Sequence, residues 1–157
     1  MNVKEILMEK YGLEIPECPK PVALYRPCAR VGNLLYLSGQ TASKDGKQAM
    51  QGIVGQDLTA EEAKVSARLA ALNLIAALNA SLEGDFSKVK QVVQILGFVR
   101  CTPEFADQPF VVNGASELFF ECFGESGIAS RAALGTNALP GGASVEVLAV
   151  VELVEGA

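Results

Sequence analysis

Apolar positions recur at two spacings along the chain, and each spacing predicts its own kind of element. Spacings of three and four residues predict amphipathic helices over residues 2–11, 59–80 and 110–123. Thr59 followed by Glu62 is the capping-box pattern that begins a helix, and Asn2 is a suitable cap for the first one. Gly12 and Gly124 follow the first and third segments, where glycine commonly ends a helix.

Runs of β-branched and aromatic residues bounded by turn residues predict the strands. They cover residues 22–31, 34–39, 91–100, 131–139 and 145–154, with a further short edge strand at 52–55. Gly32-Asn33 predicts a hairpin turn between the first two strands, and Pro140-Gly141-Gly142 predicts a simple hairpin of the last two. The order along the chain is therefore strand pair, helix, strand, helix, strand pair.

This order predicts an α+β fold in which one mixed β-sheet carries two helices on one face. The 157 residues suffice for one domain. We expect residues 1–21 to form an N-terminal helix and a proline-rich arm, and residues 22–157 to form the single domain. Because the strands are apolar on both faces, we expect the face without helices to be buried against other subunits in a closed ring.

Composition removes several classes of function. A net charge of −5 argues against a broad basic surface for nucleic acid, because phosphate binding needs clustered Lys and Arg, and it leaves a local basic groove open. The chain has no histidine, and its four cysteines lack metal-site spacing, which argues against zinc sites and His-dependent nucleophiles. Most of these cysteines are expected to be buried, reduced thiols. No apolar run is long enough to span a membrane and no leader-like segment opens the chain, so we expect a cytoplasmic location.

Two charged residues stand out in the last pair of predicted strands. Arg131 opens the first strand and Glu146 begins the second, so a simple hairpin would make them neighbours. A guanidinium suits a substrate carboxylate, and a buried carboxylate can activate water beside it. The alternative is a structural ion pair between two strands, and these two residues alone favour that interpretation.

Three motifs point further, and together they resemble one known family. The motifs are Tyr25 followed by Ser38-Gly39-Gln40, then Val112-Asn113 with Glu117 and Phe119-Phe120, and finally Arg131 with Leu139-Pro140 and Val145-Glu146-Val147. With these residues the chain resembles the YjgF-type Rid family, the reactive-intermediate (enamine/imine) deaminases. The resemblance implies a chorismate-mutase-like fold and a homotrimer, with sheets facing a central barrel and sites at the subunit interfaces.

The resemblance also implies roles for single residues. Arg131 would grip the carboxylate of a 2-imino acid, and Glu146 would position or activate the hydrolytic water. Tyr25, Gly39 and Asn113 would complete the substrate pocket, with neither a metal nor an organic cofactor. We therefore expect hydrolytic deamination of enamines or imines. A non-catalytic regulatory trimer that binds a small carboxylate is the alternative, and an endoribonuclease ranks last because the chain is acidic and lacks histidine.

Overall fold

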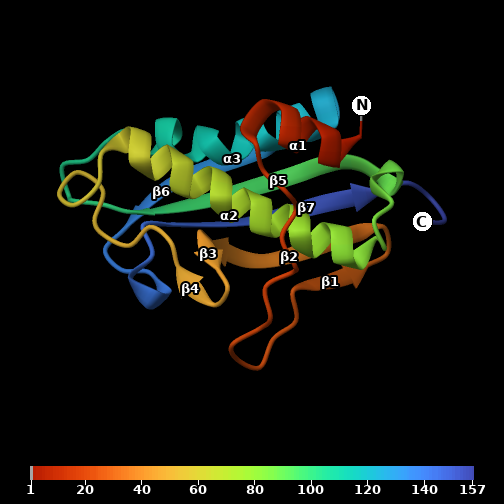
Figure 1. The fold of residues 1–157 in the computed structure, drawn as a ribbon, viewed down its shortest axis with the longest axis horizontal. Coiled ribbons are helices and arrows are strands. Elements are labelled where there is room, and N and C mark those ends of the chain that lie inside the picture. The colour runs from red at the N-terminus through yellow and green to blue at the C-terminus, as the bar shows by residue number, and fades with distance from the viewer. Residues whose placement is uncertain (1) are drawn as a thin grey trace.

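The computed structural model describes residues 2–157 and shows one layer of helices over one face of a β-sheet (Figure 1). The elements in chain order are α1 (Val3–Tyr11), β1 (Cys28–Val31), β2 (Leu34–Thr41), β3 (Ser43–Lys44), β4 (Lys47–Gln48), α2 (Ala60–Ser81), β5 (Val89–Arg100), α3 (Gln108–Phe123), β6 (Ser130–Thr136) and β7 (Val145–Leu153). Helices α2 and α3 pack against the sheet, and α1 packs against α3. The predicted α+β class and mixed sheet are confirmed.

The sheet has the strand order β1-β2-β7-β5-β6, with β5 and β6 parallel and every other pair antiparallel. The predicted hairpin of the last two strands is therefore wrong, because β5 lies between β6 and β7. Chain segments β5, α3 and β6 form a crossover unit, which makes β6 parallel to β5 and leaves β7 to pair on the other side of β5. Residues 137–144 consequently cross the end of β5 and are not a tight hairpin turn.

Two other strand predictions need correction. The strand predicted from residue 22 begins only at Cys28, and residues 22–27 form a protruding loop in which Val22 and Leu24 are fully exposed (Figure 1). Pro21 and Pro27 bracket this loop, and neither can donate a ladder hydrogen bond. The edge strand predicted at residues 52–55 is reduced to isolated bridges made by Val54.

The helix boundaries follow the predicted capping residues. The Thr59 hydroxyl accepts from the Glu62 amide at 3.2 Å, and the Glu62 carboxylate accepts from the Thr59 amide at 2.8 Å. Asn2 and Glu5 form the same reciprocal pair at the start of α1. These contacts satisfy backbone donors that have no partner within the helix, and they explain why local sequence was sufficient here.

Two glycines allow close packing, one between α2 and α3 and one between α3 and β5. A Cβ on Gly114 of α3 would lie 2.0 Å from the Lys64 carbonyl oxygen of α2. A Cβ on Gly97 of β5 would lie 2.5 Å from a methyl of Val112 in α3. Fully buried side chains from both layers fill the core between them, including Leu74, Ile75, Leu78, Ile95, Leu118, Phe119 and Leu153.

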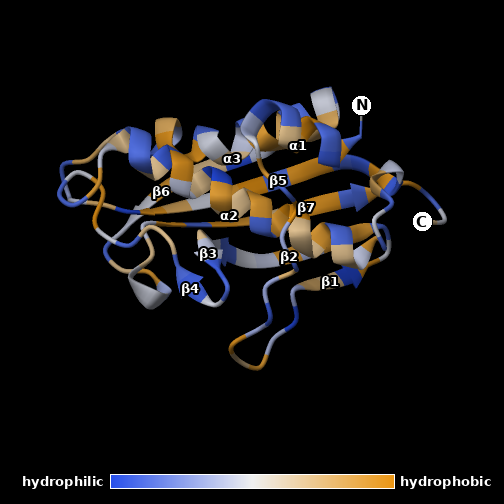
Figure 2. Cartoon of the chain, in the orientation of Figure 1, coloured by the Kyte–Doolittle hydropathy of each residue, from blue (hydrophilic) through white to orange (hydrophobic). Residues whose placement is uncertain are grey.

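Strands β5 and β7 are hydrophobic along much of their length (Figure 2), so the face of the sheet away from the helices is also apolar. By strand alternation it carries Tyr36, Leu96, Phe98, Leu134, Leu148 and Val150. We call these six residues the open face. Tyr36 and Leu134 are 49% and 48% exposed, so one copy of the chain leaves much of this surface in contact with solvent.

The structure also tests the expectations about the cysteines and about membrane-spanning segments. All four cysteines are free, but only Cys122 is buried, so the expectation that most would be buried is wrong. Cys18, Cys28 and Cys101 are partly buried because they lie on the arm and at strand ends, outside the packed core. Within residues 2–157, none of the helices combines the length and apolar character needed to cross a bilayer.

The close crossing at Gly114 predicts a strong stability effect. Gly114→Ala should lower the free energy of unfolding by about 2 kcal/mol, because the new methyl meets backbone and not a movable side chain. Urea denaturation measures this loss. Val65→Ala on α2, where the side chain is 42% exposed, is the control and should change stability by less than about 0.5 kcal/mol. Equal stabilities of Gly114→Ala and wild type would contradict the packing described here.

Candidate functional site

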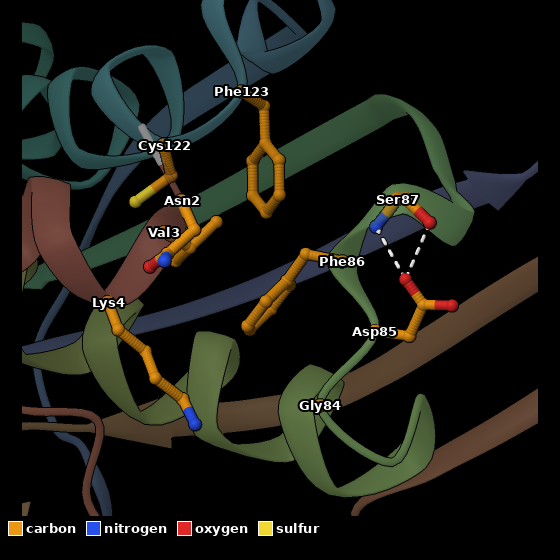
Figure 3. Close-up of a pocket in the computed structure, with 9 residues that line it drawn as sticks. All are labelled: Asn2, Val3, Lys4, Gly84, Asp85, Phe86, Ser87, Cys122 and Phe123. Atoms are coloured by element: carbon orange, nitrogen blue, oxygen red, sulfur yellow. Dashed lines mark hydrogen bonds between the residues drawn. The ribbon is translucent and has the colours of Figure 1, made fainter.

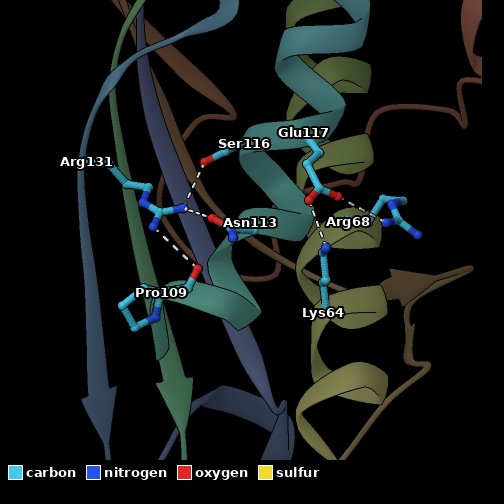
Figure 4. A network of polar contacts seen from close by, with 7 residues as sticks. All are labelled: Lys64, Arg68, Pro109, Asn113, Ser116, Glu117 and Arg131. Carbon is cyan, nitrogen blue, oxygen red and sulfur yellow. Dashed lines mark hydrogen bonds and ion pairs between the residues drawn. The ribbon is translucent and has the colours of Figure 1, made fainter. Parts of the chain in front are cut away.

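Arg131 lies on edge strand β6, where oxygen atoms from the first half of α3 hold its guanidinium (Figure 4). Nη1 donates to Asn113 Oδ1 at 2.7 Å and to Ser116 Oγ at 3.2 Å, and Nη2 donates to the Pro109 carbonyl at 3.3 Å. No carboxylate of residues 2–157 forms an ion pair with Arg131. The contacts orient the guanidinium and leave its charge uncompensated, as binding of an anion requires.

Local sequence explains how α3 presents these oxygens. Asn113 and Ser116 are three residues apart, so they lie on the same side of the helix and face the same guanidinium. Gly97 lets Val112 approach β5, which brings this side of α3 close to β6. Pro109 stands in the first turn of α3, where its missing amide proton has no cost. Its carbonyl is the third acceptor.

Glu117 belongs to the same helix but serves a different purpose (Figure 4). Its carboxylate lies 2.7 Å from Lys64 Nζ and 3.6 Å from Arg68 Nη2, both on α2. Lys64 Nζ also lies 5.0 Å from the centre of the Phe110 ring. Glu117 therefore ties α3 to α2 at a distance from Arg131, and its carboxylate is already engaged.

Glu146, Gly39 and Tyr25 line one cavity of about 690 Å³. The other walls come from the proline-rich arm, the β3–β4 hairpin, Asn73 of α2 and Pro140. A Cβ on Gly39 would lie 3.1 Å from the Glu146 carboxyl carbon, so the glycine provides the space in which this carboxyl rests. A larger residue at position 39 would displace the Glu146 side chain.

Tyr25 reaches this cavity from the protruding loop of residues 22–27. Ser38 holds the end of the loop, because its hydroxyl donates to the Arg26 carbonyl at 2.6 Å and its amide donates to the Pro27 carbonyl at 2.9 Å. The Tyr25 ring remains 48% exposed. The Ser38-Gly39 pair thus has two local roles, since Ser38 anchors the loop and Gly39 makes room for Glu146.

The Glu146 carboxyl is half-buried, and burial raises its pKa above the ordinary value of 4.5. No side chain or amide of residues 2–157 donates a hydrogen bond to it, and it makes no ion pair within that range. An unpaired carboxyl with a raised pKa holds a proton more readily than a surface glutamate does. These are the properties of a group that exchanges protons with water or a ligand.

The two groups of residues lie on opposite faces of the sheet. Gly97 marks the helix face, and the register places it beside Ala133 of β6 and Val147 of β7. Arg131, two residues before Ala133, therefore points to the helix face, whereas Glu146, next to Val147, points to the open face. They are also separated by β5, with about 4.8 Å between neighbouring strands.

Within one copy of the chain, Arg131 is therefore hydrogen-bonded to Asn113, and Glu146 shares a cavity with Gly39 and Tyr25. One copy does not bring the two groups together. The predicted contact between Arg131 and Glu146 depended on the hairpin that the structure replaces with a crossover. The structural ion pair considered as the alternative is likewise absent among the described residues.

A second cavity, of about 490 Å³, lies where α1 meets the α2–β5 connection (Figure 3). Burial raises the pKa of its Cys122 thiol to about 12, so this sulfur stays protonated at neutral pH. The Asp85 carboxylate accepts from the Ser87 amide at 3.1 Å. The rings of Phe86 and Phe123 pack with their centres 6.0 Å apart. These groups are engaged with one another, and the cavity offers weaker chemistry than the one at Glu146.

Sequence reasoning missed several residues around both groups. Ser116 and the Pro109 carbonyl hold Arg131, and Asn73 and Gln48 line the cavity at Glu146. Asn73 carried a usable signal, because it is an amide within the alanine- and leucine-rich stripe of α2. Gln48 lies in a polar segment where a glutamine is unremarkable.

Comparison with known proteins agrees with this architecture. The sequence profile of the YjgF/chorismate mutase-like family, whose description carries an endoribonuclease label, matches residues 5–153. The chain belongs to the YjgF/chorismate mutase-like family. The matched range includes most of α1 and the whole arm, together with every strand of the five-stranded sheet.

Proteins similar to this member of the YjgF family are known from several organisms. TCP17 of Trypanosoma cruzi is 39% identical over 147 residues, which is 93% of this chain and 91% of that protein. A solved structure of a protein of unknown function from Agrobacterium tumefaciens is 42% identical, with a TM-score of 0.91, over 97% of this chain and 92% of that chain. The 2-iminobutanoate/2-iminopropanoate deaminase of Dermatophagoides farinae is 27% identical over 139 residues, covering 88% and 93%.

The raised pKa of Glu146 predicts how stability depends on pH. A raised carboxyl pKa favours folding below the unfolded value of 4.5, and this contribution is lost as pH rises through the folded pKa. Glu146→Gln should therefore gain stability relative to wild type between about pH 4 and about pH 7. Urea unfolding at both pH values measures the difference.

Glu152→Gln is the matched control on the same strand and face. Hydrogen bonds from Lys90 and Gln91 lower the pKa of Glu152, so its contribution to stability is present above the unfolded value and lost in acid. This variant should lose stability relative to wild type over the same pH interval. If both variants changed in the same direction, the assigned environment of Glu146 would be wrong.

Proposed function

We propose that this protein hydrolyses reactive 2-imino acids, and the enamines that tautomerise to them, to 2-oxo acids and ammonia. The main support for the proposal is that the chain supplies both a carboxylate-binding arginine and a proton-exchanging glutamate. Neither residue forms an ion pair within the described chain. Arg131 is oriented by three neutral oxygens, and Glu146 is half-buried without a donor. The similarity to the Dermatophagoides farinae deaminase supports this reaction class.

We further propose that the protein acts as a homotrimer whose open faces line a central barrel. The open face supports this, since six apolar residues across four strands are left uncovered by the chain's own helices. Arg131 lies on an edge strand, where a neighbouring copy can approach. Each site then combines Arg131 and Asn113 of one copy with Glu146, Gly39 and Tyr25 of the next.

In the proposed reaction, the guanidinium of Arg131 binds the substrate carboxylate by paired hydrogen bonds and so fixes the adjacent imine carbon. The substrate enters with its imine nitrogen protonated. Glu146 takes a proton from water as the water oxygen bonds to the imine carbon, and the C=N π electrons move to the nitrogen to give a neutral carbinolamine. Glu146 then returns its proton to the amine, the C–N bond breaks, and ammonia leaves. The hydroxyl proton is lost as the 2-oxo acid forms, which restores the starting protonation state.

Two features of this chain suit the reaction. Burial of Glu146 raises its affinity for the proton that it must hold between the two halves of the cycle. The space above Gly39 leaves this carboxyl free to face the imine carbon. Since water is the only other reactant, the residues named here suffice to bind, orient and exchange protons.

Deamination of 2-iminobutyrate, generated in place by an amino-acid oxidase, tests the activity. Arg131→Ala should lower kcat/KM about 100-fold, because the variant loses a charged, bidentate contact to the carboxylate. Glu146→Gln should lower kcat about 100-fold and change KM less, since it keeps the shape but cannot exchange the proton. The assay adds semicarbazide, which traps the imine, and measures how far the enzyme lowers the amount of trapped product.

Arg30→Ala is the control for charge removal. Arg30 is exposed and donates to the Gly32 and Ala157 carbonyls, away from both groups, so wild-type rates are expected. A wild-type protein that is folded and assembled but does not accelerate imine loss would refute the deaminase proposal. Thermal stabilisation by 2-oxo acids in that case would favour a protein that only binds small carboxylates.

Mixing the two inactive variants tests whether sites are shared between copies. When Arg131→Ala and Glu146→Gln chains are unfolded together and refolded at equal amounts, about one quarter of the interfaces should pair an intact arginine with an intact glutamate. Activity should return to about one quarter of the wild-type value. Activity no higher than that of the separately refolded variants would mean that the two residues act within one copy or not together.

A further inference from the structure

The protruding loop of residues 22–27 carries a leucine at its tip. The Tyr25 amide donates to the Ala23 carbonyl at 2.9 Å, so Leu24 is the central residue of a three-residue turn. The Leu24 side chain is fully exposed, and so is that of Val22 on the same loop. One exposed leucine is common on a protein surface, but here two apolar side chains stand together on a projecting segment.

The shape of this loop is restrained at both ends. Pro21 and Pro27 fix their own φ angles. Ser38 donates to the carbonyls of Arg26 and Pro27 with its hydroxyl and its amide. A contact made by the tip therefore costs little conformational entropy, because the loop is already ordered.

An exposed aromatic ring lies beside Arg131 on the helix layer. Oxygens at positions 109, 113 and 116, on one side of α3, hold the Arg131 guanidinium. Phe120 continues this side of α3, four residues after Ser116. Side chains on a helix lean towards the preceding turn, which directs the Phe120 ring towards Ser116. The ring is 43% exposed.

Ile128 extends this apolar surface at the approach to β6. A Cβ on Gly127 would lie 2.9 Å from the Phe120 amide nitrogen, so the chain before β6 runs directly against α3 at this point. Ile128 follows Gly127, is 60% exposed, and precedes Arg131 by three positions. We call Phe120 and Ile128 the edge patch.

The loop and the edge patch lie at opposite edges of the sheet. The loop leads into β1, the strand at one edge, and the edge patch adjoins β6, the strand at the other edge. Figure 1 shows the loop projecting beyond β1. The two surfaces are therefore too far apart to meet within one copy. They can meet between successive copies that pack head to tail in a closed ring.

The charges beside the two surfaces are of opposite sign. Arg26 follows Tyr25 on the loop, and the Glu125 carbonyl accepts from the Ile128 amide at 3.1 Å. Arg26 and Glu125 are both exposed, and neither forms an ion pair within residues 2–157. A second copy of this chain is thus a partner of matching charge for each surface, and the pair favours this orientation.

We propose that Leu24 of one copy packs on the edge patch of the next copy and closes the shared site beside Arg131. This inference rests on the proposed function, which brings Tyr25 of one copy to Arg131 of the next. Because Leu24 adjoins Tyr25 and the edge patch adjoins Arg131, the same approach joins the two apolar surfaces. The contact excludes water from the guanidinium, which strengthens its hydrogen bonds to the substrate carboxylate.

Cross-linking between copies tests the contact. A Leu24→Cys/Ile128→Cys double variant treated with a short bis-maleimide should give bands of two and three linked chains on a denaturing gel. A head-to-tail ring predicts both bands, because each copy is linked to the next. Bands of two chains alone would indicate a two-fold contact and would overturn the inference, as would the absence of both bands.

Three controls account for the four native cysteines, all of which are free. Wild type and each single-cysteine variant measure the background, and the double variant should exceed it. Leu24→Cys combined with Val65→Cys is the matched pair, because Val65 is exposed on α2 and does not belong to the edge patch. This pair should give neither band above background.

Leu24→Ser measures how much the contact contributes without any added cysteine. Loss of a buried leucine contact should raise the protein concentration at which copies separate by at least about tenfold. Sedimentation over a dilution series measures this concentration. Met8→Ser removes a 47% exposed apolar side chain from α1 and should associate as wild type does. Equal association of the two variants would contradict the proposed contact.

The cross-link and the imine assay separate failure of the contact from failure of the function. If wild type hydrolyses 2-iminobutyrate but the double variant gives no linked chains, the contact is wrong and the proposed function stands. If both bands form but wild type hydrolyses no imine, the contact is supported and the proposed function is refuted.

Discussion

The position of β5 between β6 and β7 determines where the chemistry of this protein lies. A crossover through α3 makes β6 an edge strand parallel to β5, and β7 pairs with the other side of β5. Register and alternation then turn Arg131 towards the helices and Glu146 towards the open face. One topological choice thus separates two charges that are only fifteen positions apart in the sequence.

The separation leaves each charge in an environment that suits a ligand better than a partner within the chain. Neutral oxygens of α3 hold Arg131 without cancelling its charge. Glu146 rests over Gly39, half-buried, where burial favours its protonated form. Glu117, on the same helix as Asn113, is by contrast paired with Lys64 and Arg68. This contrast separates the proposed site from the neighbouring charge cluster that ties α3 to α2.

Local sequence was sufficient for elements whose boundaries are set by neighbouring residues. The capping box of Thr59 and Glu62 marked the start of α2, and Gly32-Asn33 marked the β1–β2 hairpin. Strand order was not predictable in this way. The sequence Pro140-Gly141-Gly142 is compatible both with a tight hairpin turn and with a longer connection that crosses the end of another strand. The protruding loop of residues 22–27 was misread for a related reason, since its apolar residues look like a strand when nothing shows what they contact.

The candidate site was predictable only in part. The strand pattern pointed to Arg131 and Glu146, and family resemblance added Asn113, Gly39 and Tyr25. The structure places Arg131 with Asn113, and Glu146 with Gly39 and Tyr25. The Pro109 carbonyl could not be read from residue type, because backbone oxygens are common to every residue. Gln48 and Asn73 depend on the arm and the β3–β4 hairpin closing over one cavity, which is a non-local event.

Opposite placement of Arg131 and Glu146 has a kinetic meaning under the proposed assembly. A newly made chain would be folded yet inert, and catalysis would begin only when copies meet. The amount of active enzyme would then rise more steeply than the amount of protein, and specific activity would fall on dilution. A cell could thus set the threshold for clearing reactive imines through expression level alone, without a separate regulator.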